Sequence, residues 1–212
     1  NLREGHYAEF CYNHEMIKAI TFDLDGVYFK AGCWNNFIKN LPKKVTDEEK
    51  IRYILVKSPE MTAFRIGRIT EEDYWNFARN ELGIDVDNEG IFKSLRDNYE
   101  INSEVRDFVK EVKVRGLKTC ICSSNTVTRT RELNKKFDFF KDFDVRVFSF
   151  EVGIAKPDKE IFEELVRQTG CEANEIIYAD DNESSYKSAL SVGINAFLNT
   201  IFEDFKSKCS IF

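Results

Sequence analysis

The sequence predicts an α/β fold, namely a Rossmann-like doubly wound parallel sheet with an inserted helical cap domain. From residue 103 onward, short apolar segments alternate with amphipathic helical patterns, and short connections join them. This alternation is typical of a parallel sheet covered by helices on both faces. One further apolar segment, residues 17–22, lies far upstream, beyond a stretch with helical patterns only. That stretch is therefore expected to be an insertion into the α/β domain.

The predicted strands are apolar and bounded by turn residues. The first, 17–22, is rich in β-branched and aromatic residues and ends in two aspartates. The other predicted strands are residues 117–124, 144–150, 175–179 and 194–198. The helices between them are expected to end at Gly116 and near Leu133, and to cover 158–168 and 184–192. The α/β core domain is thus expected to comprise residues 16–29 and 100–212.

The inserted stretch, residues 30–99, is predicted to be a helical cap domain. Apolar residues at helical spacing predict a first helix over 34–41. Thr46, followed by an acid three residues later, predicts a second N-terminus, and a loop is expected around Ser58. Thr70 predicts the start of a third helix that Gly83 ends, and a short helix is expected over 91–99.

Composition excludes several classes of function. The 212 residues carry a formal net charge of −6, which argues against general nucleic-acid binding. No apolar run reaches the ~20 residues of a membrane span, and the amino terminus lacks a signal pattern. The six cysteines form no Cys-x-x-Cys pair, so reduced thiols and a cytoplasmic location are expected, with Cys120 and Cys122 facing one side of the sheet.

Both histidines precede Met16, so mechanisms that need a histidine base or a histidine-bound zinc have almost no support. Residues 1–15 show no periodicity and are expected to be an extension or a cloning remnant outside the fold. The role of the carboxyl-terminal residues 202–212 stays open between packing on the core and association.

Polar side chains lie at or beyond the carboxyl ends of four of the predicted strands. In open α/β sheets, ligands bind beyond the carboxyl ends of the strands. The residues found there are Asp23 and Asp25, then Ser123, Ser124 and Asn125, then Lys156, and finally Asp180 and Asp181. Each group alone is compatible with an ordinary turn or helix cap. Four such groups at one edge of a sheet instead indicate a shared site.

The chemistry of these residues favours phosphoryl transfer. Four carboxylates in one cleft repel each other unless a divalent cation lies among them, and oxygen ligands favour Mg²⁺. A cation and a lysine facing one point suit a phosphoryl group. One carboxylate can then attack phosphorus, while a second acts as acid and base.

Four segments together resemble the motifs of the haloacid dehalogenase superfamily, in its subfamily with a small helical cap. They are Asp23-x-Asp25-Gly26-Val27, the strand ending in Ser124-Asn125, Gly153-x-x-Lys156-Pro157-Asp158, and Ile176-Ile177-Tyr178-Ala179-Asp180-Asp181. The resemblance covers residue 16 to about residue 198.

The resemblance implies a role for each site residue. Asp23 would be the nucleophile and a metal ligand. Asp25 would be the general acid and base, with its backbone carbonyl on the metal. Ser124, favoured over Ser123 because it precedes Asn, would bind the phosphoryl oxygens with help from Asn125. Lys156 would neutralise charge on the nucleophile and the phosphate. Asp181 would bind Mg²⁺ directly, and Asp180 directly or through water.

The resemblance therefore implies a magnesium-dependent phosphatase. The dehalogenating members lack an acid at the position of Asp25, so its presence favours phosphoryl chemistry. The expected substrate is a small phosphate monoester such as a sugar phosphate, and Arg65 or Arg68 of the cap is a candidate for contacting it. The alternatives are a phosphomutase, whose relatives often carry a cap histidine that is absent here, and a non-catalytic binding or regulatory protein on the same fold.

Overall fold

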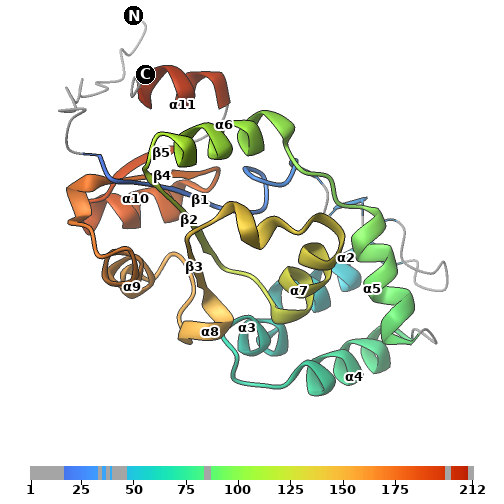
Figure 1. Cartoon of the computed structure of the whole chain (residues 1–212). Coiled ribbons are helices and arrows are strands. Elements are labelled where there is room, and N and C mark those ends of the chain that lie inside the picture. Colours follow the sequence, from blue (N-terminus) through green and yellow to red (C-terminus); the bar gives the residue numbers. More distant parts are fainter. Residues whose placement is uncertain are drawn as a thin grey trace, which may run out of the picture.

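Five parallel strands form the core of the chain in the computed structural model, which describes residues 17–32, 35, 36, 39, 47–83, 87–198 and 202–209. The strands lie in the order β3-β2-β1-β4-β5 (Figure 1). Their bounds are β1 Ala19–Phe22, β2 Lys118–Ser123, β3 Val145–Phe148, β4 Ile176–Asp180 and β5 Asn195–Leu198. The predicted Rossmann-like α/β fold is confirmed.

The central strand, β1, fixes the position of the site. Its last residue, Phe22, pairs with Ile121 of β2 on one side and with Ala179 of β4 on the other. The strand order reverses at β1, because β2 and β3 extend to one side of it and β4 and β5 to the other. Ligands in open α/β sheets bind at such a reversal. The ends of β1, β2 and β4 are therefore brought together at the expected place.

Helices cover both faces of the sheet (Figure 1). One face packs against α6 (Ser103–Val114) and α11 (Phe202–Cys209), and the other against α9 (Lys159–Thr169) and α10 (Glu183–Ser191). The ring of Phe22 contacts both Phe108 of α6 and Phe205 of α11 edge-on, at centroid distances of 6.4 Å and 5.9 Å. Phe205 thus packs on the core, whereas Ile211 lies outside the described residues.

The opposite face buries the two alternating cysteines. Cys120 and Cys122 lie in one apolar cluster with residues of α9 and α10, as predicted from their spacing on β2. Both are free thiols without exposed area. They serve as small apolar residues of the core.

The segment between β1 and β2 is helical wherever secondary structure is assigned in residues 47–97. It contains α2 (Glu48–Arg52), a π-helical turn (Tyr53–Lys57), α3 (Pro59–Arg65), α4 (Glu71–Leu82) and α5 (Asn88–Asp97). Thr70 caps α4 in a reciprocal capping box with Asp73, as its sequence predicts. Most of the helix expected over 34–41 lies outside the described residues.

Three local predictions about these elements are wrong. The residue that caps α2 is Asp47, whose Oδ1 accepts from Lys50 N at 2.9 Å, and Thr46 lies outside the described residues. No longer loop occurs at Ser58, which is the N-cap of α3: its hydroxyl accepts from Met61 N, and the proline after it suits the first helical turn. Residues 149 and 150, expected in a strand, belong to α8 (Ser149–Val152), since pairing with β2 ends at Phe148.

The inserted helices rest on α7 (Val127–Phe137), which follows β2. Trp75 Nε1 donates to Thr128 Oγ1 at 3.1 Å, and Arg131 pairs with Glu71 of α4 at 2.7 Å. Arg96 of α5 pairs with Glu132, whose side chain has no exposed area. These contacts fix the insertion over the carboxyl edge of the sheet, with α7 as its support.

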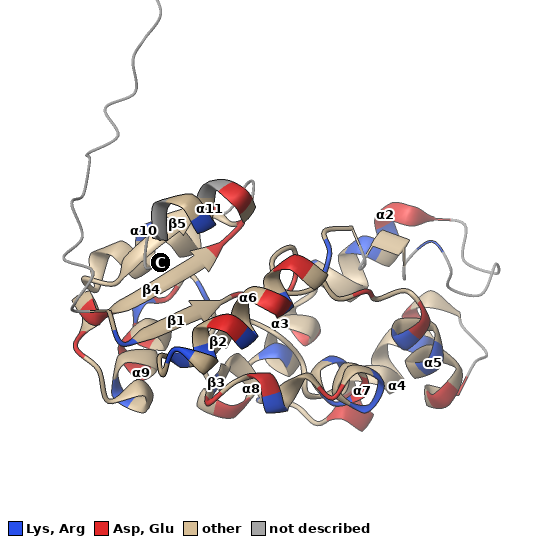
Figure 2. Ribbon diagram, turned by 45° about the horizontal axis from the view of Figure 1, so that its top comes forward, with Lys and Arg blue, Asp and Glu red and all other residues tan. Residues whose placement is uncertain are grey.

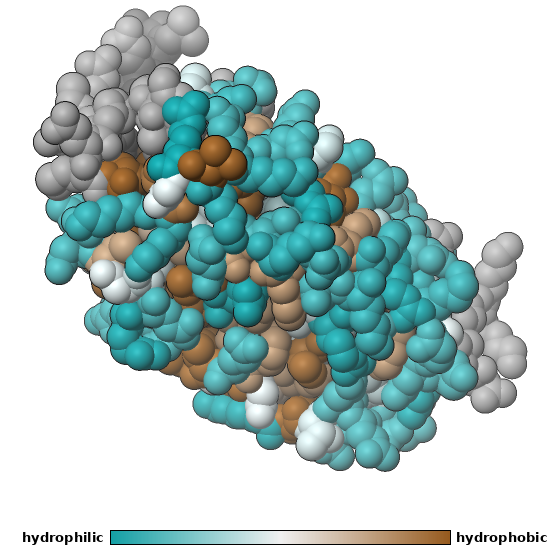
Figure 3. All heavy atoms as spheres, in the orientation of Figure 1, coloured by the Kyte–Doolittle hydropathy of each residue, from teal (hydrophilic) through white to brown (hydrophobic). Residues whose placement is uncertain are grey.

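Charged residues of both signs occur on the outer helices of the described part of the chain. Acidic and basic residues are interleaved over the outer helices (Figure 2). The face in Figure 3 is mostly hydrophilic, with small separate apolar areas. No helix in the described part of the chain has both the length and the apolarity to cross a membrane.

Candidate active site

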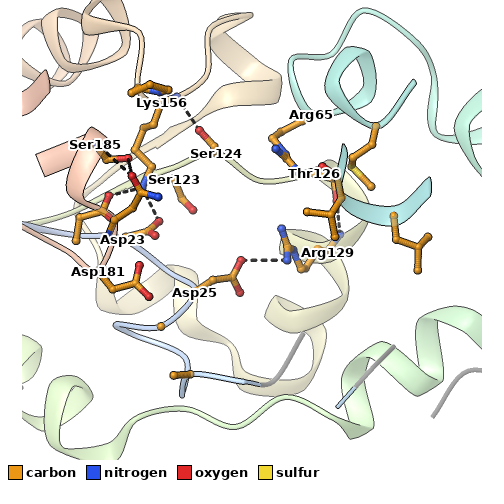
Figure 4. Close-up of a pocket in the computed structure, with 18 of the residues that line it drawn as sticks. Asp23, Asp25, Arg65, Ser123, Ser124, Thr126, Arg129, Lys156, Asp181 and Ser185 are labelled. Carbon is orange, nitrogen blue, oxygen red and sulfur yellow. Dashed lines mark hydrogen bonds and ion pairs between the residues drawn. The ribbon is translucent and has the colours of Figure 1, made fainter. Parts of the chain in front are cut away.

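A cavity of about 460 Å³ opens at the carboxyl ends of β1, β2 and β4 (Figure 4). Its size is within the usual range of small-molecule sites. Seven of the eight predicted site residues line it, and they are Asp23, Asp25, Ser123, Ser124, Lys156, Asp180 and Asp181. The inserted helices contribute an apolar wall that includes Leu55, Met61 and Trp75. The cavity therefore lies between the sheet and the insertion.

Lys156 lies between two buried carboxylates. Its Nζ is 2.8 Å from Asp23 Oδ1 and 2.7 Å from Asp180 Oδ2, and it also contacts the hydroxyl of Tyr178 at 3.0 Å. Burial alone would lower the pKa of Lys156, but the charges of Asp23 and Asp180 raise it above its ordinary value. The lysine is thus held as a cation beside Asp23.

The hydroxyl of Tyr178 also donates to Asp180. Tyr178 is buried on β4, two residues before Asp180, so the alternation of the strand directs both side chains the same way. Sequence reasoning did not assign Tyr178 a role, although this two-residue spacing was a signal that could have done so.

Three carboxylates form a group that suits a hard divalent cation. Asp23, Asp180 and Asp181 each place one oxygen within 4.8 Å of the others. Burial, reinforced by the charges of Asp180 and Asp25, raises the pKa of Asp23 to about 6 despite the opposing effect of Lys156. Burial and Asp180 also raise the pKa of Asp181. This excess of negative charge and the all-oxygen donor set fit Mg²⁺.

Gly26 allows the loop after β1 to approach this cluster. Its φ is +82°, and a Cβ built on it would lie 2.1 Å from Asp181 Oδ2. A side chain at this position would thus collide with a carboxylate of the cluster. Asp25, one residue earlier, has its carboxylate outside the three-residue group; the predicted binding of a metal through its backbone carbonyl stays a prediction.

The carboxylate of Asp25 is held by donors from the core and from the end of the insertion. Arg129 Nη1 lies 3.0 Å from its Oδ2, Tyr99 donates to Oδ1 at 3.1 Å, and Asn125 Nδ2 donates to Oδ2 at 3.4 Å. Arg129 Nη1 also donates to Tyr99. Sequence reasoning missed both Arg129 and Tyr99. The i, i+4 spacing of Asn125 and Arg129 at the start of a helix was a signal for Arg129, whereas nothing in the sequence pointed to Tyr99.

Asn125 does not line the cavity. Its Oδ1 accepts from Arg129 Nε at 2.5 Å, and its Nδ2 faces Asp25. Its side chain thus orients these two residues, and its predicted contact with phosphate stays a prediction. Ser123 and Ser124 both line the cavity, and Ser124 Oγ accepts from the backbone N of Lys156 at 2.7 Å.

Ser149 links the loop after β2 to the insertion. Its hydroxyl accepts from Asn125 N at 3.0 Å and donates to the carbonyl oxygen of Arg65, at the end of α3, at 2.6 Å. The structure distinguishes between the two arginines of the insertion that the sequence suggests as substrate contacts. Arg65 lines the cavity, whereas Arg68 is exposed and is not among the residues lining it.

Two known proteins are similar to the chain in sequence. The chain is 24% identical over 87% of its length to a phosphorylated carbohydrates phosphatase of Thermotoga maritima, covering 86% of that protein. It is 25% identical over 71% of its length to a putative uncharacterized protein of Dictyostelium discoideum and covers 66% of it.

A solved structure shows the same architecture. It is a HAD family enzyme from Bacteroides thetaiotaomicron in complex with magnesium and inorganic phosphate. The match has a TM-score of 0.72 and 21% identity and covers 89% of this chain and 98% of the other. The family model for haloacid dehalogenase-like hydrolases matches residues 17–193, so the chain belongs to this family of hydrolases.

Proposed function

We propose that the protein is a Mg²⁺-dependent phosphatase that hydrolyses small phosphate monoesters through an aspartyl phosphate on Asp23. The observation that carries the proposal is the group of Asp23, Asp180 and Asp181 with Lys156 among them, at the reversal point of the sheet. The names of similar proteins support it, since one is called a phosphorylated carbohydrates phosphatase and another was solved with magnesium and phosphate.

Asp23, Asp180 and Asp181 are the proposed metal ligands. When bound, Mg²⁺ would supply positive charge for the phosphoryl oxygens and allow them to approach the carboxylate nucleophile. Lys156 adds a second positive charge beside Asp23, and Ser124, which lines the cavity, is the proposed hydroxyl donor to a phosphoryl oxygen. Leu55, Met61 and Trp75 of the insertion line the cavity, where they would limit the access of bulk water.

The proposed reaction has two steps. Asp23 attacks phosphorus, the bond to the ester oxygen breaks, and Asp25 protonates the departing alkoxide. Asp25, now a carboxylate, then takes a proton from a water molecule that attacks the aspartyl phosphate and releases inorganic phosphate. The donors from Arg129, Tyr99 and Asn125 position Asp25 for both transfers.

Hydrolysis of p-nitrophenyl phosphate and of a panel of sugar phosphates, with Mg²⁺ and with chelator, tests the proposal. We expect metal-dependent turnover that Asp23→Asn abolishes. Asp107→Asn is a matched control, because Asp107 is exposed on α6 and pairs with Lys110. Turnover that survives chelation, or an Asp23→Asn variant as active as the control, would contradict the mechanism.

A further inference from the structure

One end of the cavity carries positive charge that the proposed phosphate site does not use. In Figure 4, Asp23, Asp181 and Lys156 lie on one side, and Arg65 and Arg129 lie on the other, with Asp25 between them. Arg129 comes from α7 of the core and Arg65 from α3 of the insertion. Both guanidinium groups belong to residues that line the cavity.

Arg65 lacks a carboxylate partner among the described residues. One terminal nitrogen donates to the carbonyl oxygen of Val56 at 3.3 Å. Its Nε is buried and has no hydrogen-bond partner in the described part of the chain. A buried donor left unpaired is costly, so a site with such a donor is incomplete without a ligand or water.

The acids that line the cavity are already matched to other groups. Asp25 is paired with Arg129, and Lys156 contacts Asp23 and Asp180. With the proposed divalent cation bound, Lys156 and the cation would balance the charges of Asp23, Asp180 and Asp181. Arg65 therefore brings one positive charge in excess. Burial and the neighbouring charge of Arg129 lower the pKa of Arg65. An anion beside the two guanidinium groups could accept from the unpaired Nε of Arg65 and would offset the repulsion between Arg65 and Arg129.

We infer that this end of the cavity is a subsite for a second anionic group of the substrate, a carboxylate or a second phosphate, and that Arg65 is the residue that binds it. The inference rests on the proposed phosphatase function and narrows its substrate class. Leu55, Met61 and Trp75 line the cavity as well, so the group joining the two anions can be a short carbon chain.

A homologous series of esters tests the subsite. The substrates are ω-phosphooxy carboxylic acids of increasing chain length, their primary amides, and the corresponding bisphosphates, each assayed with Mg²⁺. We expect the best acid or bisphosphate to exceed its amide in kcat/KM by about 10-fold or more, the value of a charge-assisted hydrogen bond. Preference between acid and bisphosphate identifies which anion is bound.

Variants separate binding from a structural role. Arg65→Gln should bring the ratio of acid to amide close to one, and Arg65→Lys should retain part of it. Arg68→Gln is the matched control, since Arg68 is three residues away and exposed, and it should keep the wild-type ratio. An Arg65→Gln variant that loses activity equally on acid and amide would show a structural role only and would overturn the inference.

The assays can reject the subsite without rejecting the phosphatase function. Equal kcat/KM for acid and amide in the wild type would remove the subsite while leaving the phosphatase intact. Binding of the same compounds to Asp23→Asn, measured by calorimetry with Mg²⁺, gives a reading that does not depend on turnover. If Asp23→Asn binds each acid and its amide with equal affinity, the inference is overturned, whether or not the wild type hydrolyses any ester. If the wild type hydrolyses none of the esters, the proposed function is contradicted instead.

Discussion

The guanidinium of Arg129 lies 3.0 Å from the carboxylate of Asp25, and both groups belong to residues that line the cavity. Arg129 is at the start of the helix that also supports the insertion, and its Nε holds Asn125. The position of Asp25 is thus set by residues far from it in the sequence. This arrangement gives the proposed acid and base one orientation in the cavity.

We expect Asp25→Asn to fold, because its amide oxygen can still accept from Arg129 and its NH2 group can donate to the hydroxyl oxygen of Tyr99. The variant cannot protonate a leaving group, so kcat on alkyl phosphates should fall by about 10²–10⁴-fold. With p-nitrophenyl phosphate, whose leaving group needs no proton, formation of the aspartyl phosphate should persist. Rapid-quench trapping of the phosphorylated protein measures this, and equal loss on both kinds of ester would contradict the role.

Gly26→Ala should weaken metal binding, because the added Cβ would lie 2.1 Å from Asp181 Oδ2. Gly32→Ala is a matched control with a similar φ of +85°, and no atom of the described residues lies within 4 Å of the added Cβ. Both variants carry the strain of a left-handed residue, roughly 1–2 kcal/mol. Only Gly26→Ala should lose Mg²⁺ affinity, by about 10–100-fold. Calorimetric titration with Mg²⁺ tests this, and equal affinities in both variants would contradict it.

Stabilisation by Mg²⁺ should depend on pH. Because the pKa of Asp23 is about 6 in the folded protein and 3.8 ordinarily, the metal-free folded state binds a proton more tightly than the unfolded chain. The stability of the metal-free protein should therefore fall as pH rises from 3.8, the ordinary pKa of this side chain, through about 6. Mg²⁺ binds the ionised carboxylates, so it should raise Tm more at about pH 7.5 than at about pH 5. A rise in Tm independent of pH would contradict this reasoning.

Glu132→Gln should loosen the insertion from α7. Burial alone would raise the pKa of Glu132, but its hydrogen bonds from Lys135, Arg131 and Arg96 lower it below the ordinary value. The hydrogen bonds to ionised Glu132 therefore stabilise the folded protein at pH values above the ordinary pKa of a glutamate. This stabilisation is lost as pH falls through the lowered pKa of Glu132 in the folded protein. We expect a cost of about 1–3 kcal/mol near neutral pH, which shrinks on acidification.

Urea unfolding of Glu132→Gln at neutral and acidic pH measures this cost. The control is Asp97→Asn, which breaks the exposed pair with Lys93 on α5 and should leave stability unchanged. An equal loss of stability at both pH values would show that the ionised form of Glu132 is not what stabilises the insertion.

Much of the fold could be predicted because apolar segments and turn residues are local signals. The strand 17–22 and the aspartates after it are readable from composition, and the alternation after residue 103 implies the parallel order. Where the signal was ambiguous, the prediction failed. Ser149 and Phe150 read as strand because they continue an apolar run, but the partner strand ends before them.

The site was predictable only where residues follow strands. Asp23, Ser124 and Asp180 could be placed together because parallel strands end at one edge of a sheet. Arg129 reads as an ordinary helical charge, and its partner Asp25 is in another part of the chain. Distinguishing Arg65 from Arg68 likewise required burial, which depends on how the insertion packs.

The hydroxyl of Ser149 attaches the insertion to the core at a further point, besides the two chain connections and the contacts with α7. It joins the backbone of the loop after β2 to the end of α3, so the two segments are held in register by one small side chain. A different helical insertion grafted between β1 and β2 would keep this contact only if its own backbone placed a carbonyl oxygen at the same point. Exchange of this module between related proteins therefore preserves the attachment only where the end of α3 and the start of α8 match in position.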